Sequence, residues 1–176
     1  MEDSTDPAAR HPMPQSHVLL VDDDPALLDA LSGTLQARFG HFTLDTCESG
    51  TQALELAKQR PYDTIIVDVN MPQMNGLQFL AEVKQVQPKT PVLMITAHAN
   101  RTLMARALDG GAADFIPKPF EREDVVQAVR RGLELSRLQS VARKLEGRHR
   151  STLERVGMVR QEWEHAARHR FEQEPF

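Results

Sequence analysis

The 176-residue chain has a single cysteine, Cys47, and no long apolar run. One cysteine excludes an internal disulfide and a cysteine-based zinc site, and it fits a reducing cytoplasm, where we expect the protein to reside. No segment approaches the roughly 18 consecutive apolar residues of a membrane span. The polar N-terminus also lacks the apolar stretch of a secretion signal, so we expect no membrane association.

The chain also has no excess of positive charge: its net charge is −4. Nucleic-acid-binding proteins are usually strongly basic, so we expect no direct nucleic-acid partner. The charge is uneven: residues 1–135 contain 12 Lys and Arg against 19 Asp and Glu, whereas residues 136–176 contain 9 against 6. An acidic body is therefore followed by a mildly basic tail.

Five short apolar runs alternate with amphipathic segments from residue 17 onward. The runs are HVLLV (17–21), HFTLD (41–45), DTIIV (63–67), PVLMI (91–95) and DFIP (114–117). The segments between them have helical spacing of apolar residues, as in Leu28, Leu31 and Leu35. Strands that are apolar nearly throughout belong to a parallel sheet covered on both faces. The pattern predicts an α/β domain of five strand–helix units with right-handed crossovers.

This domain, assigned to residues 17–135, is flanked by two segments of different character. Residues 1–16 contain three prolines and few apolar residues, which predicts a disordered leader. In the tail, Leu138, Val141 and Leu145 follow a 3–4 spacing. We therefore predict that residues 136–176 form a long helical, coiled-coil-like extension or a helical hairpin, with too few apolar residues for a core of its own.

Polar side chains directly follow four of the five runs. Asp22, Asp23 and Asp24 follow the first, Asp68 the third, Thr96 the fourth and Lys118 the fifth. Ligands bind at the carboxyl ends of the strands of such sheets. Clustered carboxylates repel one another unless a cation neutralises them, and Mg²⁺ prefers oxygen ligands. Since a lysine and a hydroxyl suit phosphoryl oxygens and a carboxylate can act as nucleophile, the set predicts an aspartyl phosphate site.

Four segments carry these residues: VLLVDDDP (18–25), TIIVDVNMPQMNG (64–76), PVLMITAHA (91–99) and DFIPKPF (114–120). Together they resemble the receiver family of two-component response regulators, over roughly residues 17–135. The resemblance implies a flavodoxin-like, doubly wound, five-stranded parallel sheet with strand order 2-1-3-4-5, as in the chemotaxis member of the family. The long C-terminal helical extension would follow this sheet.

The resemblance also implies a phospho-acceptor and a metal site. Asp68 matches the acceptor and is expected to be one of the Mg²⁺ ligands. Asp23 matches a direct ligand and Asp22 a ligand acting mostly through water. The backbone carbonyl of Asn70 would supply a further oxygen. Mg²⁺ is the only cofactor that the resemblance implies.

Other positions match residues that stabilise or report the phosphate. Lys118 would pair with it, and its bond to the following proline is expected to be cis. Thr96 would hydrogen-bond the phosphoryl group and move inward, which lets Phe115 rotate into the vacated space. Phe115 stands where many relatives have tyrosine. Asn70 and His98 match positions that tune the lifetime of the phosphate.

The implied function is that of a response regulator rather than an enzyme. A histidine kinase or phosphotransfer protein would present phosphohistidine to Asp68, and the phosphate would bias a two-state equilibrium. The change would reach the face formed by the fourth helix, fifth strand and fifth helix. We hypothesise that the extended fifth helix then pairs with a second copy, because its leucine spacing is continuous with that face.

Three other functions share part of the pattern. A haloacid-dehalogenase-like phosphatase needs a second aspartate two residues after its nucleophile, where this chain has Asn70. A structural adaptor with a vestigial site finds no support, since no site residue is missing. A DNA-binding regulator would need two compact helices with a tight turn, which the tail lacks. Each site residue alone has a plain structural explanation; Asp22, Asp23 and Asp24, for example, could simply cap the first helix. Chance is a poor explanation for the whole set, because four independent strand ends would all have to resemble the same site by accident.

Overall fold

The computed structural model describes residues 16–40, 42–98 and 100–172, with the side chains of 149, 152–157 and 159–172 excepted. The predicted leader therefore lies outside the described residues, apart from Ser16, which begins the first strand. None of the helices in these ranges is both long and apolar enough to cross a membrane.

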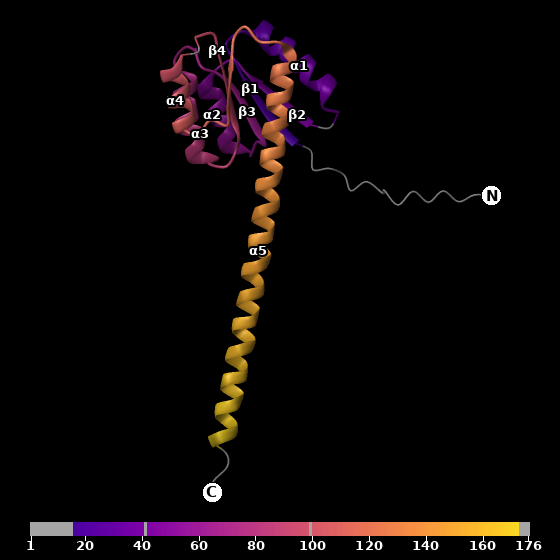
Figure 1. Ribbon diagram of the computed structural model, residues 1–176, viewed down its shortest axis with the longest axis vertical. Coiled ribbons are helices and arrows are strands. Elements are labelled where there is room, and N and C mark those ends of the chain that lie inside the picture. The colour runs from indigo at the N-terminus through magenta and orange to yellow at the C-terminus, as the bar shows by residue number, and fades with distance from the viewer. Residues whose placement is uncertain (1–15, 41, 99, 173–176) are drawn as a thin grey trace, which may run out of the picture. The chain divides into compact units, whose positions relative to one another are not determined.

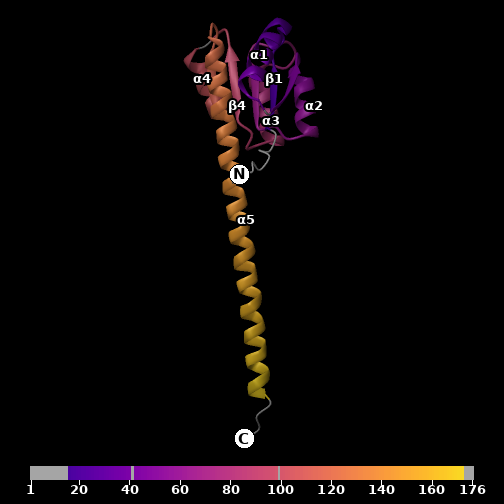
Figure 2. The same cartoon turned by 90° about the vertical axis from the view of Figure 1, so that its right-hand side faces the viewer.

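One parallel sheet of five strands forms the centre of the domain (Figures 1 and 2). Its order is β2-β1-β3-β4-β5, which confirms the predicted topology. β3 and β4 are buried along their whole length, as expected of central strands covered on both faces. The strands are β1 (Ser16–Val21), β2 (Phe42–Cys47), β3 (Thr64–Asp68), β4 (Val92–Thr96) and β5 (Asp114–Pro117).

Five helices cover the two faces of this sheet. They are α1 (Pro25–Arg38), α2 (Gly50–Gln59), α3 (Gly76–Val86), α4 (Arg101–Asp109) and α5 (Arg122–Glu172). Helices α2, α3 and α4 contribute to one buried cluster, and α1 and the start of α5 to the other. Successive strand residues supply opposite faces, so Leu19 and Val21 enter the first cluster and Val18 and Leu20 the second.

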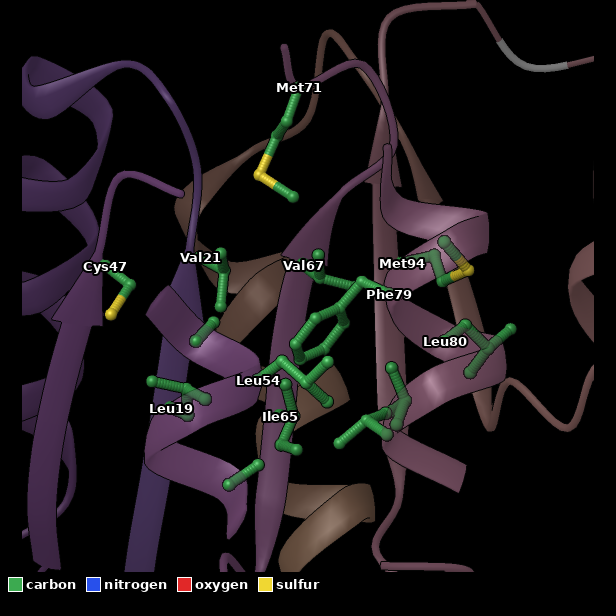
Figure 3. Packing of buried hydrophobic residues seen from close by; sticks show 14 of the residues in the cluster. Leu19, Val21, Cys47, Leu54, Ile65, Val67, Met71, Phe79, Leu80 and Met94 are labelled. Atoms are coloured by element: carbon green, nitrogen blue, oxygen red, sulfur yellow. The ribbon is translucent and has the colours of Figure 1, made fainter. Parts of the chain in front are cut away.

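Phe79 of α3 is at the centre of the first cluster and is fully buried. In Figure 3 its ring lies among Leu54 of α2 and Ile65 and Val67 of β3. Apolar burial of this kind supplies most of the folding free energy, at roughly 25 cal/mol per Å² of buried apolar surface. The cluster therefore fixes β3, whose carboxyl end carries Asp68.

The chain divides into two compact units, residues 1–137 and 138–176. The division lies two residues beyond the boundary expected from the sequence. Between Arg122 and Glu172 the structure contains one helix and not a hairpin. Within the second unit, Leu138, Val141 and Leu145 are all exposed.

Near the end of the first unit, α5 approaches the start of β3 closely. A Cβ atom added to Gly132 would lie 2.8 Å from Oγ1 and 2.9 Å from Cγ2 of Thr64. One turn later, Ser136 Oγ donates to Asp63 Oδ1 at 3.2 Å, and Asp63 Oδ2 accepts from the backbone N–H of His17 at 2.8 Å. One carboxylate thus joins β1, β3 and α5 at the amino end of the sheet.

Candidate functional site

Lys118 joins two buried carboxylates at the carboxyl ends of β1 and β3. Its Nζ lies 2.8 Å from Asp68 Oδ1 and 3.2 Å from Asp22 Oδ2. Asp22 and Asp68 are 2% and 3% exposed, so both carboxylates are shielded from solvent. The register explains the meeting, because Val21 pairs with Val67 and the next residue of each strand is an aspartate.

The loop after β5 brings Lys118 to this position. The Lys118 backbone N–H donates to the carbonyl of Thr96 at 2.7 Å, so the end of β5 is attached to the end of β4. The peptide bond between Lys118 and Pro119 is cis, which confirms the expectation from the sequence. Lys118 is 96 residues from Asp22 and 50 from Asp68, so only the parallel sheet brings the three together.

Burial and charge shift the pKa of two of these groups. Burial is the largest influence on Asp22 and raises the pKa of its carboxyl, although the backbone N–H of Asp24 and the Lys118 ammonium oppose the shift. Burial alone would lower the pKa of Lys118, but the hydrogen bond to Asp68 and the charges of both acids outweigh it and raise that pKa. Lys118 therefore remains charged at neutral pH and holds the two carboxylates side by side.

Both oxygens of Asp68 have a donor. Oδ1 accepts from Lys118, and Oδ2 accepts from the backbone N–H of Asn70 at 2.6 Å. The loop after β3 can turn this closely because Gly76 packs onto it: a Cβ there would collide with the carbonyl oxygen of Asp68. The carboxylate is thus held in one orientation by groups on both sides.

The Asn70 side chain links this loop to β4. Its Nδ2 donates to Thr96 Oγ1 at 3.2 Å and lies 3.5 Å from His98 Nδ1. The backbone N–H of His98 also donates to Thr96 Oγ1, at 3.2 Å. Thr96 is completely buried, whereas Asn70 and His98 are exposed. The predicted hydroxyl and both lifetime positions therefore form one hydrogen-bonded group beside Asp68.

Sequence patterns contain no sign of the contact between Asn70 and Thr96. The two residues are 26 positions apart and belong to adjacent strand ends, where Asp68 pairs with Ile95. Periodicity predicts that both strands exist, but it does not define their register. The resemblance identified Asn70 and Thr96 separately. Only the tertiary structure shows that the two side chains are in contact.

Two of the three consecutive aspartates after β1 differ from Asp22 in their surroundings. Asp23 is exposed, and no hydrogen bond or ion pair joins its side chain to the described residues. Asp24 caps α1, with its Oδ1 accepting from the backbone N–H groups of Ala26 and Leu27. The plain capping explanation is thus right for Asp24. Of the predicted metal ligands, the structure brings Asp22 and Asp68 together and leaves Asp23 outside that contact.

Phe115, the predicted switch residue, lies on β5 and is partly buried. It packs against the cluster formed by α2, α3 and α4. The backbone N–H of Phe115 donates to the side chain of its neighbour Asp114 at 2.8 Å, and Asp114 also accepts from Arg131 of α5. The residue thus contacts the core at the edge strand of the sheet.

The oxygen donors fit a magnesium ion, although they do not form a complete cage. Among the described residues, no three carboxylate, imidazole or thiolate groups gather into a metal site. Mg²⁺ does not need three, because it is usually held by one or two carboxylates together with waters and phosphate oxygens. Asp22 and Asp68 are two buried carboxylates side by side, and a cation would offset the burial that raises the pKa of Asp22.

Comparisons with known proteins agree with this geometry. The family model for the response regulator receiver domain matches residues 18–130. The transcriptional regulatory protein GlrR of Escherichia coli (strain K12) is 36% identical over 121 residues, which cover 69% of this chain and 27% of GlrR. The chemotaxis protein CheY of Bacillus subtilis (strain 168) is 30% identical over 118 residues, covering 67% of this chain and 98% of CheY.

A solved structure shares the fold. Chemotaxis protein CheY4 of Vibrio cholerae aligns with a TM-score of 0.63 and 32% identity, covering 68% of this chain and 99% of CheY4. The chain spans only about a quarter or less of the first curated relatives it matches, so the likeness to them concerns one domain. The matched residues include the whole sheet from Val18 onward and the Lys118–Asp68 contact. The chain therefore belongs to the response regulator receiver family of two-component signalling proteins.

Proposed function

We propose that Asp68 accepts a phosphoryl group from a histidine kinase or a phosphotransfer protein. The observation that supports this most directly is the Lys118 ammonium, 2.8 Å from Asp68 and 3.2 Å from Asp22. A buried carboxylate held by an ammonium is oriented for attack, and the same ammonium can compensate the negative charge of an arriving phosphoryl group. The chain acts as a signalling module in which Asp68 is modified.

In the transfer, an Asp68 carboxylate oxygen attacks the phosphorus in line with the leaving group. The P–N bond of phosphohistidine breaks, its electron pair returns to the imidazole nitrogen, and that nitrogen takes up a proton. Lys118 and the Thr96 hydroxyl donate to the phosphoryl oxygens, on which charge is spread in the transition state. The Asn70 N–H on Asp68 Oδ2 keeps the carboxylate plane fixed during the attack.

Asp22, Asp68 and the backbone carbonyl of Asn70 would hold Mg²⁺, with Asp23 as a further ligand predicted by the resemblance. When bound, the ion supplies positive charge that neutralises the acids and the phosphoryl oxygens. The two buried carboxylates and the raised pKa of Asp22 support this assignment.

Phosphorylation would then change the conformation through Thr96 and Phe115. Thr96 is completely buried at the end of β4, and Phe115 lies on the adjacent strand, packed at the edge of the core. Movement of the hydroxyl toward the phosphate would free space that the ring can enter. Lifetime tuning by Asn70 and His98 is supported by their exposure and by their contacts with Thr96 or with one another.

The acceptor assignment is tested with a small phosphodonor. We expect wild-type protein with Mg²⁺ and phosphoramidate to gain one phosphoryl group by mass spectrometry, and Asp68→Asn to gain none because an amide oxygen is a poor nucleophile. Chelation of Mg²⁺ by EDTA should abolish the labelling. Asp29→Asn, which removes an exposed acid of α1, is the matched control and should label normally. Full labelling of Asp68→Asn would show that the acceptor is another residue.

We also propose a second copy of the chain as a partner of α5. Leu138, Val141 and Leu145 lie on one face at 3–4 spacing and are 57%, 48% and 59% exposed. Two such faces can bury one another in a parallel helix pair. Phosphorylation would favour this pair, since α5 begins in the domain that carries Asp68.

A further inference from the structure

We infer that the Asn70 side chain is a positioning residue, which presents the Thr96 hydroxyl to the phosphoryl group on Asp68. The inference rests on the proposed function and concerns how the site performs it. Thr96 Oγ1 accepts two hydrogen bonds, from Asn70 Nδ2 at 3.2 Å and from the backbone N–H of His98 at 3.2 Å.

The hydrogen-bonding capacity of the Thr96 hydroxyl limits the role that it can play. A threonine hydroxyl has two lone pairs and one hydrogen. The two donors occupy both lone pairs, and no acceptor within the described ranges receives the hydrogen. The hydrogen is therefore the one part of the hydroxyl still available for a hydrogen bond, so the hydroxyl can interact with a further group only as a donor. A phosphoryl oxygen is an acceptor and suits this arrangement.

Asn70 is placed to connect the hydroxyl with the reacting carboxylate. Its backbone N–H holds Asp68 Oδ2 at 2.6 Å while its side chain holds Thr96, so one residue sets the relative position of nucleophile and donor. The side chain itself is exposed and takes no part in either buried cluster. Its removal would therefore free one lone pair of Thr96 without opening a cavity in the core.

The His98 N–H alone would not fix the hydroxyl. With one lone pair unoccupied, the Thr96 O–H can turn about its C–O bond and point its hydrogen away from the site. The same hydroxyl would serve both directions of phosphoryl chemistry. In hydrolysis, water attacks the phosphorus, the bond from Asp68 oxygen to phosphorus breaks, and inorganic phosphate leaves with the carboxylate restored. Both transition states place charge on the same phosphoryl oxygens.

A double-mutant cycle in the full chain tests whether Asn70 acts through the Thr96 hydroxyl or affects the reaction independently of it. Phosphorylation by phosphoramidate with Mg²⁺, and loss of phosphate after donor removal, are followed on phosphate-affinity gels. Asn70→Ala is made in three backgrounds: wild type, Thr96→Ser, which keeps the hydroxyl, and Thr96→Val, which keeps only the shape. Asn75→Ser is the matched control, because it removes an amide from the same loop while keeping a residue that can cap α3.

We expect Asn70→Ala to slow both reactions about five-fold in the wild-type and Thr96→Ser backgrounds, the effect of one well-placed hydrogen bond. The maximal phosphorylation rate should fall while the half-saturating phosphoramidate concentration stays the same. In the Thr96→Val background, Asn70→Ala should change either rate by less than about 1.5-fold, since no hydroxyl remains to be positioned.

Two results would overturn the inference. A five-fold loss that persists in the Thr96→Val background would mean that Asn70 acts by a route that does not include Thr96. A faster reaction in Asn70→Ala would mean that the amide restrains the hydroxyl and does not present it. Either result leaves Asp68 labelling intact, whereas labelling that survives Asp68→Asn would refute the proposed function and this inference with it.

Discussion

Lys118 is the residue on which the geometry of the site depends. Without it, Asp22 and Asp68 would be two buried carboxylates side by side, and such a pair is strongly destabilising because each disfavours ionisation of the other. The lysine itself is 27% exposed at its side chain, so its charge is only partly withdrawn from solvent. The folded domain thus places one partly accessible ammonium beside two buried acids.

A second charged cluster lies around Tyr62, just before the amino end of β3 and outside the proposed site. The Tyr62 hydroxyl donates to Asp45 Oδ2 at 2.8 Å and accepts from Arg60 Nε at 3.0 Å. Burial, followed by the hydrogen bond to Asp45, raises the pKa of Tyr62 to about 12. The shift means that the fold favours the protonated phenol.

Because Tyr62 is the only tyrosine of the chain, its titration can be observed directly. We expect the absorbance of native protein at 295 nm to rise with a midpoint near pH 12, and that of urea-unfolded protein near pH 10. The protonated phenol stabilises the folded state relative to the unfolded state. This contribution is fully present below pH 10 and is lost as the pH rises through about 12. A native midpoint near 10 would contradict the hydrogen-bonded, buried environment.

At the level of the elements, the contact between α5 and β3 depends on a glycine. In most helix interiors alanine is more stable than glycine by about 0.5–1 kcal/mol. At Gly132, however, an added Cβ would lie 2.8 Å from the Thr64 hydroxyl. Thr64 cannot easily move, since it is completely buried and its hydroxyl donates to the Asp63 carbonyl at 2.7 Å.

We therefore expect Gly132→Ala to lower the free energy of unfolding by about 1–3 kcal/mol, the usual cost of overpacking a core. Urea denaturation followed by far-ultraviolet circular dichroism measures the change. Gly33→Ala in α1 is the matched control, because nothing lies within 4 Å of its added Cβ. It should stabilise the protein by about 0.5–1 kcal/mol. Equal effects of the two substitutions would argue against the close approach of α5 to β3.

For the whole molecule, the exposed face of Leu138, Val141 and Leu145 predicts association. Sedimentation velocity should show a mainly monomeric protein that shifts toward a dimer when beryllofluoride and Mg²⁺ mimic the phosphate on Asp68. Leu138→Ser combined with Leu145→Ser should prevent the shift, because it removes the apolar face that two copies would bury.

Arg143→Ser is the matched control for association. Arg143 is exposed on the side of α5 away from the apolar face, five positions after Leu138, so its loss should leave the dimer intact. A protein that remains monomeric at high concentration with beryllofluoride would refute the pairing.

Much of the fold could be predicted from local patterns in the chain. The five apolar runs predicted five strands, and their near-continuous apolar character predicted a parallel sheet between two layers of helices. Strand bounds were less accurate: the run at 41–45 became β2 at Phe42–Cys47. This difference in bounds has a physical reason. β2 is a half-buried edge strand, so its ends are set by pairing with β1 and not by its own composition.

The sequence alone determined which residues are candidates for the proposed phosphoryl chemistry, because Asp22, Asp68, Thr96 and Lys118 each directly follow an apolar run, and parallel strands end at one edge. Tertiary structure decided how these residues contact one another. Register made neighbours of Asp22 and Asp68, packing placed Lys118 between them, and the loop after β3 brought the Asn70 amide to Thr96. Local patterns depend on neighbouring residues along the chain, whereas these contacts join residues 26 to 96 positions apart and form only when the sheet assembles.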